Sequence, residues 1–246
     1  MVSGAVRGRR SPSWLGGSLR VALVVSILCG TTVAFVSTEV LKLKRSPITG
    51  TTIDKLFSPR CSCRHRSALI AFSLTEKDIL TLLVIDGNGR PVVNLLRFQP
   101  ERAGFHRFRW NGEATSGRVV ADGVYRVEVR LQRQARTLVL PNNIQVDTTR
   151  PRVRLTAVRP RLIVRGGSPN SIVAHYTADE PVFAILFVDR RLVVRNRFAR
   201  KSGELRWYGR TATHLFPSGS YSVTLGALDP AGNRSRISDP VTIVLR

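Results

Sequence analysis

The residues whose types could do chemistry cluster in one short segment, Cys61-Ser62-Cys63-Arg64-His65. Alternate side chains of an extended strand point to the same face, so Cys61, Cys63 and His65 could present three ligands to zinc or copper. A fourth ligand is missing nearby, and the arginines on both sides of the segment repel a cation. The alternatives are a disulfide, within the pair Cys61 and Cys63 or between chains, two unpaired thiols, or a metal site; no cofactor is expected.

Other catalytic patterns are missing from the sequence. The four histidines lie far apart, and no nucleophile elbow, phosphate loop or zinc-binding helix is present. The adjacent acids Asp179 and Glu180 precede Pro181 in what we interpret as a solvated loop. We therefore expect no enzymatic activity, and the competing hypothesis from that class is a hydrolase with an unrecognised site.

An uncharged apolar run extends from Val21 to Thr38. If it spans a membrane, it determines where the rest of the chain is located. Roughly twenty apolar residues in helical geometry cross a bilayer, so we predict a transmembrane signal anchor over 21–41 behind a basic cytoplasmic tail over 1–20. A cleaved signal peptide, with Thr32-Val33-Ala34 as the cleavage motif and the cut near Ala34, is the main alternative, and a buried core helix is the other. The sequence leaves this choice open.

The orientation of the anchor does not follow from charge. Arginines precede the apolar run and lysines follow it, so the bias toward a positive cytoplasmic side nearly cancels. We therefore assign the orientation of the anchor from the expected fold of the remaining chain. We predict a single-pass protein of the plasma membrane, with a cytoplasmic N-terminus and extracytoplasmic C-terminal domains.

Short β-branched segments separated by turn residues fill the chain from Ser67 onward. Turns such as Asp86-Gly87-Asn88-Gly89 contain residues that tolerate positive φ, and no helical period of useful length appears. This spacing is typical of β-sandwiches. We predict a tether with the Cys-x-Cys pair over 42–66, one sandwich over 67–150 and a second over 151–246, with an interdomain boundary at Asp147 to Pro151.

The second half of the chain repeats aromatic landmarks of the first. The segment from Gly104 through Trp110 recurs around Trp207, and Gly123-Val124-Tyr125 recurs as Gly219-Ser220-Tyr221. The repeat length of roughly one hundred residues suits an Ig-like sandwich. We expect Trp110 and Trp207 to anchor the two cores, and Tyr125 and Tyr221 to pin strand corners through their hydroxyls.

These landmarks resemble the Ig-like domain at the end of flagellar hook-capping proteins, which also occurs in other bacterial surface and secreted proteins. Asp147 to Pro151 is similar to the D-T-x-x-P links between bacterial Ig-like repeats, and Asp229 to Asn233 is similar to the D-x-A-G-N turn near their ends. The resemblance implies an all-β fold of two tandem Ig-like or fibronectin type III-like sandwiches, the second more divergent. It also implies an extracytoplasmic scaffold or adhesion-type module, whereas the membrane anchor replaces the hook-capping N-terminal region.

The formal charge of +23 raises the question of which anionic partners the protein binds. Only five of the 39 basic residues are lysines, and many arginines alternate with apolar residues, as in Arg126 to Arg130. Alternation places arginines on the solvated face of a strand, so we do not expect nucleic-acid binding. The sequence predicts a membrane-anchored extracytoplasmic protein with a structural or binding role at the bacterial cell surface. Its partners would be the membrane and either an anionic cell-wall polymer or another surface protein, and its oligomeric state is left open.

Overall fold

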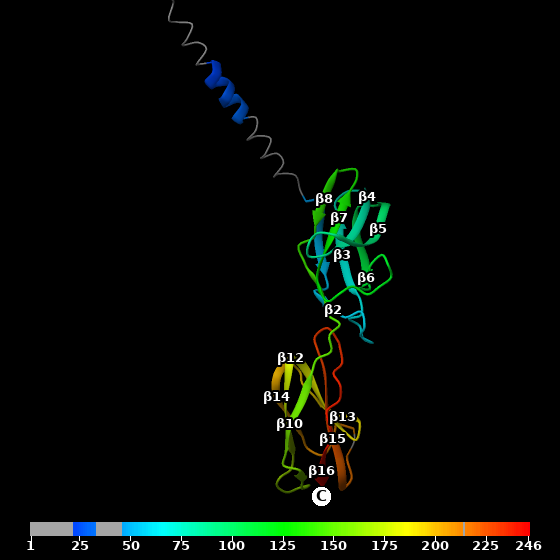
Figure 1. Ribbon diagram of the computed structural model, residues 1–246, viewed down its shortest axis with the longest axis vertical. Coiled ribbons are helices and arrows are strands. Elements are labelled where there is room, and N and C mark those ends of the chain that lie inside the picture. Colours follow the sequence, from blue (N-terminus) through cyan, green and yellow to red (C-terminus); the bar gives the residue numbers. More distant parts are fainter. Residues whose placement is uncertain (1–21, 33–45, 214) are drawn as a thin grey trace, which may run out of the picture. The chain divides into compact units, whose positions relative to one another are not determined.

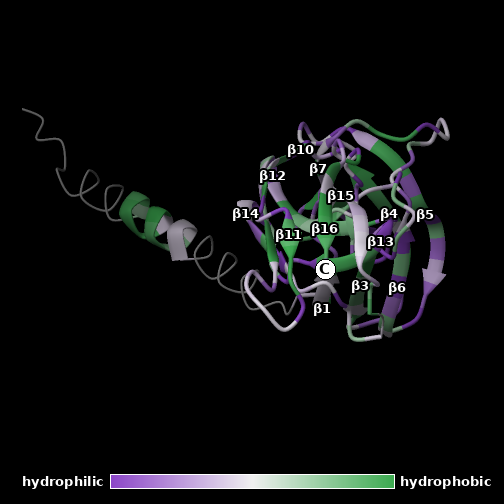
Figure 2. Ribbon diagram, turned by 90° about the horizontal axis from the view of Figure 1, so that it is seen from below, coloured by the Kyte–Doolittle hydropathy of each residue, from purple (hydrophilic) through white to green (hydrophobic). Residues whose placement is uncertain are grey.

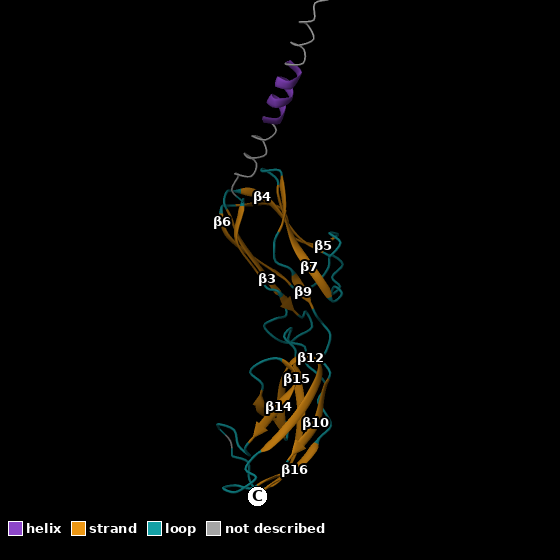
Figure 3. Cartoon of the chain, turned by 90° about the vertical axis from the view of Figure 1, so that its left-hand side faces the viewer, coloured by secondary structure: helices purple, strands orange, loops and turns teal. Residues whose placement is uncertain are grey.

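Two β-sandwiches account for most of the computed structural model, which describes residues 22–32, 46–213 and 215–246 (Figure 1). Strands dominate both sandwiches, and loops connect them (Figure 3). The strands of the first sandwich are β1 (Ile48–Ile53), β2 (Leu56–Phe57), β3 (Ala68–Leu74), β4 (Asp78–Ile85), β5 (Pro91–Glu101), β6 (Gly104–Trp110), β7 (Gly123–Leu131), β8 (Arg136–Val139) and β9 (Ile144–Val146). The strands of the second are β10 (Val153–Arg159), β11 (Leu162–Ile163), β12 (Ile172–Val188), β13 (Arg191–Arg195), β14 (Arg200–Trp207), β15 (Gly219–Leu228) and β16 (Val241–Leu245). The predicted all-β sandwich fold is confirmed.

The first sandwich is built from two separate sheets. One has the order β1-β3-β6, and the other has the order β2-β9-β7-β4-β5 with β8 added beside β7. The pairs are antiparallel except for β2, which runs parallel to β9. The buried faces of both sheets share one hydrophobic core that includes Phe72, Leu82, Trp110 and Val129.

The second sandwich repeats this pairing scheme with one difference. The first half of β12 pairs with β10 and β14, as β3 pairs with β1 and β6. The second half pairs with β13 and β15, as β4 pairs with β5 and β7. The short β11 runs parallel to β16, as β2 does to β9. The single strand β12 therefore takes the positions that β3 and β4 occupy in the first sandwich. Its pairing is irregular between Thr177 and Val182, where it passes from one layer to the other.

The tether predicted over 42–66 is partly wrong. Residues 48–53 and 56–57 form β1 and β2, which pair with β3 and β9 and complete the edges of the two sheets. Ile48, Ile53 and Phe57 are buried in the first core. The segment was missed because its buried side chains are separated by polar residues at irregular intervals, and β1 contains a register shift between Thr49 and Thr52. These residues form strands because they pair with β3 and β9, which the local sequence does not reveal.

The described part of the apolar run, residues 22–32, is helical. Its large apolar side chains are exposed, and Figure 2 shows the hydrophobic colour over the first part of this helix and a pale colour at its end. The other residues of the predicted anchor, and Ala34 at the alternative cleavage point, lie outside the described residues. Among the described residues, no helix reaches the length and apolar character needed to cross a bilayer.

Candidate functional site at the junction of the two sandwiches

The Cys-x-Cys segment lies where the two sandwiches meet. Cys61 and Cys63 form a disulfide with an S–S distance of 2.07 Å, and the loop begins directly after β2. His65 is exposed, and its backbone carbonyl accepts a hydrogen bond from the Ser58 amide at 2.9 Å. Both sulfurs are bonded to each other, so this arrangement offers no thiolate to the metal set that Cys61, Cys63 and His65 could have formed.

The disulfide packs against the turn between β15 and β16. A Cβ atom added to Gly232 would lie 2.5 Å from Cys63 Sγ and 3.4 Å from Cys61 Sγ. Gly232 also has a φ of +95°, a conformation that side chains other than glycine rarely adopt. Both the contact and the backbone therefore require glycine here, and the disulfide loop of the first sandwich closes on a turn of the second.

The turn itself is held by a carboxylate and an amide. Asp229 accepts hydrogen bonds from the Asn233 backbone N–H at 2.8 Å and from Asn233 Nδ2 at 2.7 Å. Both side chains are buried, and Ala231 between them is fully buried. A buried carboxylate with two donors is satisfied rather than orphaned, so the polar turn can pack inside the junction.

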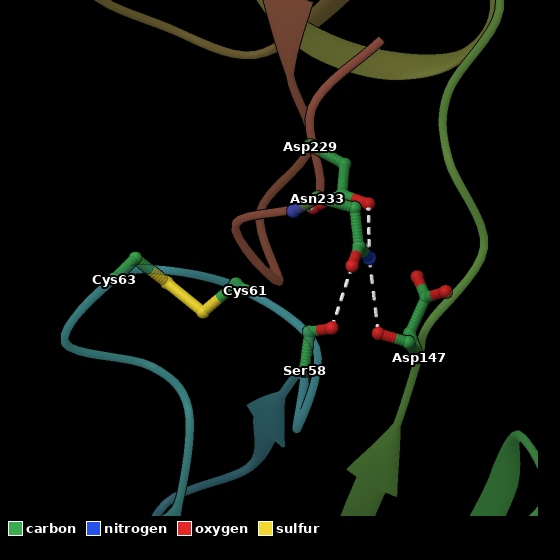
Figure 4. The surroundings of a disulfide bond; sticks show 6 residues. All are labelled: Ser58, Cys61, Cys63, Asp147, Asp229 and Asn233. Atoms are coloured by element: carbon green, nitrogen blue, oxygen red, sulfur yellow. Dashed lines mark hydrogen bonds between the residues drawn. A yellow bond between two sulfur atoms is a disulfide. The ribbon is translucent and has the colours of Figure 1, made fainter.

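Asn233 then joins three segments of the chain. Ser58 Oγ donates to Asn233 Oδ1 at 2.5 Å, and Asn233 Nδ2 donates to the Asp147 backbone carbonyl at 2.9 Å (Figure 4). Ser58 follows β2, and Asp147 follows β9. A single amide from the second sandwich therefore satisfies polar groups that follow two neighbouring strands of the first, β2 and β9, which makes it the central contact of the junction.

The interdomain link is fixed by a second carboxylate. Asp122 accepts hydrogen bonds from the Thr148 backbone N–H and Oγ1, both at 2.8 Å, and from Thr149 Oγ1 at 2.7 Å. Burial alone would raise the pKa of Asp122, but the hydrogen bonds from Thr149 and Thr148 outweigh burial and lower it. The D-T-x-x-P pattern thus acts as a set of donors for an aspartate that precedes β7.

Three acidic groups meet beside this network. Oxygen atoms of Asp147, Glu180 and Asp229 all lie within 4.8 Å of one another. Glu180, interpreted from the sequence as part of a solvated loop, lies within β12 at its irregular stretch, and that interpretation was wrong.

Burial raises the pKa of Glu180, and the carboxylates of Asp229 and Asp147 raise it further. Burial likewise raises the pKa of Asp147, with a contribution from the carboxylate of Asp229. Carboxylates of this kind are the ligands that hard divalent cations prefer, although both oxygens of Asp229 already accept hydrogen bonds.

Arginines surround the same junction in three neighbouring pockets. A pocket of about 390 Å³ is bordered by Arg60, Arg150 and Arg234. Arg234 also borders a pocket of about 260 Å³ next to the disulfide, and Arg150 borders a pocket of about 700 Å³ beside the interdomain link. The junction therefore has an acidic interior and a strongly basic rim.

The aromatic landmarks make matching contacts in the two sandwiches. Trp110 and Trp207 are each 1% exposed, and their Nε1 atoms donate to the carbonyls of Glu113 and Arg210, three residues later. Tyr125 Oη donates to the carbonyl of Ala121, and Tyr221 Oη donates to that of Pro217, in both cases four residues earlier. All four residues therefore occupy equivalent structural positions in the two sandwiches.

A family model matches part of the first sandwich. Residues 67–135 match the family model of the FlgD Ig-like domain. This span runs from the start of β3 to just beyond β7.

Solved structures that resemble the chain include fibronectin(III)-like modules and Ig tandem domains. The fibronectin(III)-like modules of Clostridium thermocellum CbhA share 16% identity at a TM-score of 0.43, covering 80% of this chain and 94% of that one. The human OSCAR ligand-binding domain shares 14% identity at a TM-score of 0.37, covering 80% of this chain and 100% of that one. The BSP domain of a biofilm associated protein shares 11% identity at a TM-score of 0.26, covering 80% of this chain but 29% of that one. A search of curated proteins gave no match.

The sequence did not identify Gly232, Asn233 and Glu180 as parts of one site. A signal existed for the first two, since they belong to the D-x-A-G-N pattern, but that pattern was interpreted only as a turn. No signal existed for Glu180, because its neighbours Asp147 and Asp229 are far away in the chain. The folded chain brings all of them to one place.

Proposed function

We propose that this protein is a membrane-anchored, extracytoplasmic Ig-like protein with a structural or binding role at the bacterial cell surface. The observation that carries the proposal is the order of its parts. An apolar helical segment comes first, and two Ig-like sandwiches follow, joined by a hydrogen-bonded junction. Ig-like and fibronectin III-like domains are generally non-catalytic, which favours a role in contact rather than in turnover.

Two features of the described helix support membrane anchoring. Leu23, Val24 and Val25, which point to different sides of the helix, are all exposed, as expected of a segment whose natural solvent is lipid. The hydroxyls of Thr31 and Thr32 both donate to the Leu28 carbonyl, at 2.9 Å and 2.6 Å. Polar side chains that bond to their own helix leave no unsatisfied hydroxyl facing hydrocarbon.

Localisation and topology can be tested together. The full chain is expressed in a bacterium with a different epitope tag at each end, and membranes are washed with alkaline carbonate. We expect both tags in the washed membrane fraction, and we expect protease added to intact spheroplasts to remove only the C-terminal tag. A C-terminal tag that becomes protease-sensitive only after lysis would contradict the extracytoplasmic orientation. Release of the C-terminal tag without the N-terminal one would instead support signal cleavage near Ala34.

A second role, as an accessory module that binds an anionic cell-wall polymer, is favoured by a specific observation. The basic rim of the junction collects arginines from the disulfide loop, the interdomain link and the turn after β15. Retention of the full chain on isolated cell wall, and its elution by salt, tests this role. Absence of retention at low ionic strength would contradict it.

A further inference from the structure

The pocket of about 390 Å³ at the junction combines arginines from three separate segments. Arg60 lies next to the disulfide loop, Arg150 belongs to the interdomain link, and Arg234 follows the turn after β15. The hydroxyl-bearing Ser62 also borders this pocket. No carboxylate is among its lining residues, whereas Asp229 and Asp179 line the two adjoining pockets.

The three guanidinium groups have no ion-pair partner within the described parts of the chain. The ion pairs found there join His106 to Glu101 and Arg130 to Glu128. Asp122 is near enough to Arg60 for the positive charge to lower its pKa, yet its oxygens are occupied by Thr148 and Thr149. Three like charges beside one pocket repel one another, and an anion would remove that repulsion.

The backbone that holds these arginines is fixed before any ligand arrives. The disulfide and its contact with Gly232 hold the segment of Arg60 against the segment of Arg234. The hydrogen bonds from Thr148 and Thr149 to Asp122 hold the link that precedes Arg150. A ligand that binds here therefore meets a preformed site and does not have to order three loops.

The chemistry of the pocket fits a phosphate ester. Guanidinium groups form paired hydrogen bonds to phosphate oxygens, and the three arginines that border this pocket come from three separate segments of the chain. A tetrahedral phosphate can accept donors from several directions, whereas a planar carboxylate accepts them mainly within its plane. We infer that this pocket is a binding site for the phosphodiester groups of an anionic cell-wall polymer.

A polymer suits the site better than a single phosphate. The central pocket shares Arg234 with one neighbour and Arg150 with the other, and those neighbours add Arg195 and Arg152 to the basic rim. Successive phosphates of one chain could therefore be bound at adjacent positions, each adding to retention. The inference rests on the proposed binding role and names the site and ligand class for it.

The test uses the full chain in a neutral detergent, with synthetic poly(glycerol phosphate) as the probe at fixed ionic strength. We expect the variant carrying R60Q, R150Q and R234Q to bind at least about tenfold more weakly than the unmodified protein, since charge-assisted hydrogen bonds are lost. The matched control carries R118Q, R133Q and R191Q, which remove the same charge from exposed arginines outside these pockets. We expect the control to bind within about twofold of the unmodified protein. Unchanged thermal melting of both variants would show that folding is intact.

Several outcomes would overturn the inference. Equal losses in the two triple variants would assign binding to net charge alone, and no loss in the site variant would remove the pocket from binding. Equal affinity for polygalacturonate with the same dependence on Arg60, Arg150 and Arg234 would contradict selectivity for phosphate. Binding to vesicles containing phosphatidylglycerol, without binding to the soluble polymer, would assign the site to lipid headgroups instead. The protease test of topology is independent of these results, so failure of the site is distinguishable from failure of the proposed surface role.

Discussion

The two sandwiches use the same aromatic landmarks, but the chain passes between their layers in different ways. In the first, β3 and β4 are separate strands with Thr75-Glu76-Lys77 between them. In the second, β12 runs through both layers and is irregular between Thr177 and Val182. Pro181 lies in that irregular stretch, where its missing N–H leaves no ladder bond unmade. The continuous strand carries Glu180 into contact range of Asp147 and Asp229, so the variation in topology and the junction chemistry occur at the same place.

This difference separates two kinds of residue. The tryptophans and tyrosines do the same work in both sandwiches and specify the fold. The residues that differ between them, such as Gly232 and Glu180, lie at the junction and specify how the two sandwiches meet. Substitutions of the two tryptophans should have similar effects in each sandwich, whereas substitutions at the junction should affect the contact between the sandwiches.

The largest expected effects come from the core tryptophans. We expect Trp110→Ala and Trp207→Ala each to lower the free energy of unfolding by about 3–5 kcal/mol, because each deletes a fully buried aromatic side chain. The matched control is Tyr208→Ala, which removes an aromatic that is 54% exposed beside Trp207. Chemical denaturation measures all three. A much smaller effect at Trp207 than at Trp110 would mean that the stability of the second sandwich does not depend on Trp207.

The next effect tests the contact that the first sandwich makes with the second. Gly232→Ala should destabilise by about 2–4 kcal/mol, because a Cβ collides with Cys63 Sγ and the backbone has positive φ. Gly117→Ala is the control, since Gly117 has a φ of +74° but open space around it. Differential scanning calorimetry of both variants isolates the contribution of the disulfide contact.

A double-mutant cycle sharpens the same result. In a background with Cys61→Ala and Cys63→Ala, the colliding sulfur is gone, so Gly232→Ala should fall to about the 1–2 kcal/mol of backbone strain. An unchanged penalty in that background would place the origin of the effect in the turn rather than in the disulfide.

The tyrosine hydroxyls should give a smaller effect that differs between the sandwiches. Tyr125→Phe should lower stability by about 1 kcal/mol, since its hydrogen bond to the Ala121 carbonyl is partly buried. Tyr221→Phe should cost less, because its bond to Pro217 is exposed to water that can replace it. Urea denaturation of the two variants compares them, and a larger loss at Tyr221 would reverse the assignment.

The smallest effects depend on pH and have opposite signs at two carboxylates. The pKa of Glu180 is raised in the folded state by burial and by the carboxylates of Asp229 and Asp147, so its negative charge opposes folding at neutral pH. Glu180→Gln should therefore stabilise by less than about 1 kcal/mol at neutral pH, because solvent screens the charges, and the gain should vanish below the unfolded pKa of a glutamate.

Asp122 provides the contrast. Burial would raise its pKa, but hydrogen bonds from Thr149 and Thr148 lower it overall, so its charge favours folding above the unfolded pKa of an aspartate. Asp122→Asn should therefore destabilise at neutral pH, and the difference should shrink as pH falls through the folded pKa. Thermal melting between about pH 3 and pH 7 follows both variants. The same sign at both positions would contradict the electrostatic assignment.

The amino-acid sequence by itself determined the fold class. Alternating apolar residues, turn residues and the recurring landmarks around Trp110 and Trp207 are local patterns, and a local pattern is sufficient to predict a sandwich. The sequence failed where local pattern and tertiary role diverge. β1 and β2 looked like a tether because their burial depends on β3 and β9, and Glu180 looked like a loop residue because β12 is irregular around it.

Only the tertiary structure decided what the junction is. Ser58, Asp147 and Asn233 meet through hydrogen bonds that span up to 175 positions of the chain, and no spacing rule relates residues so far apart. The same holds for Arg60, Arg150 and Arg234, which looked like scattered charges on solvated strands and loops. Long-range contacts are set by how whole sheets pack, so the chemistry of this junction becomes visible only when both sandwiches have formed.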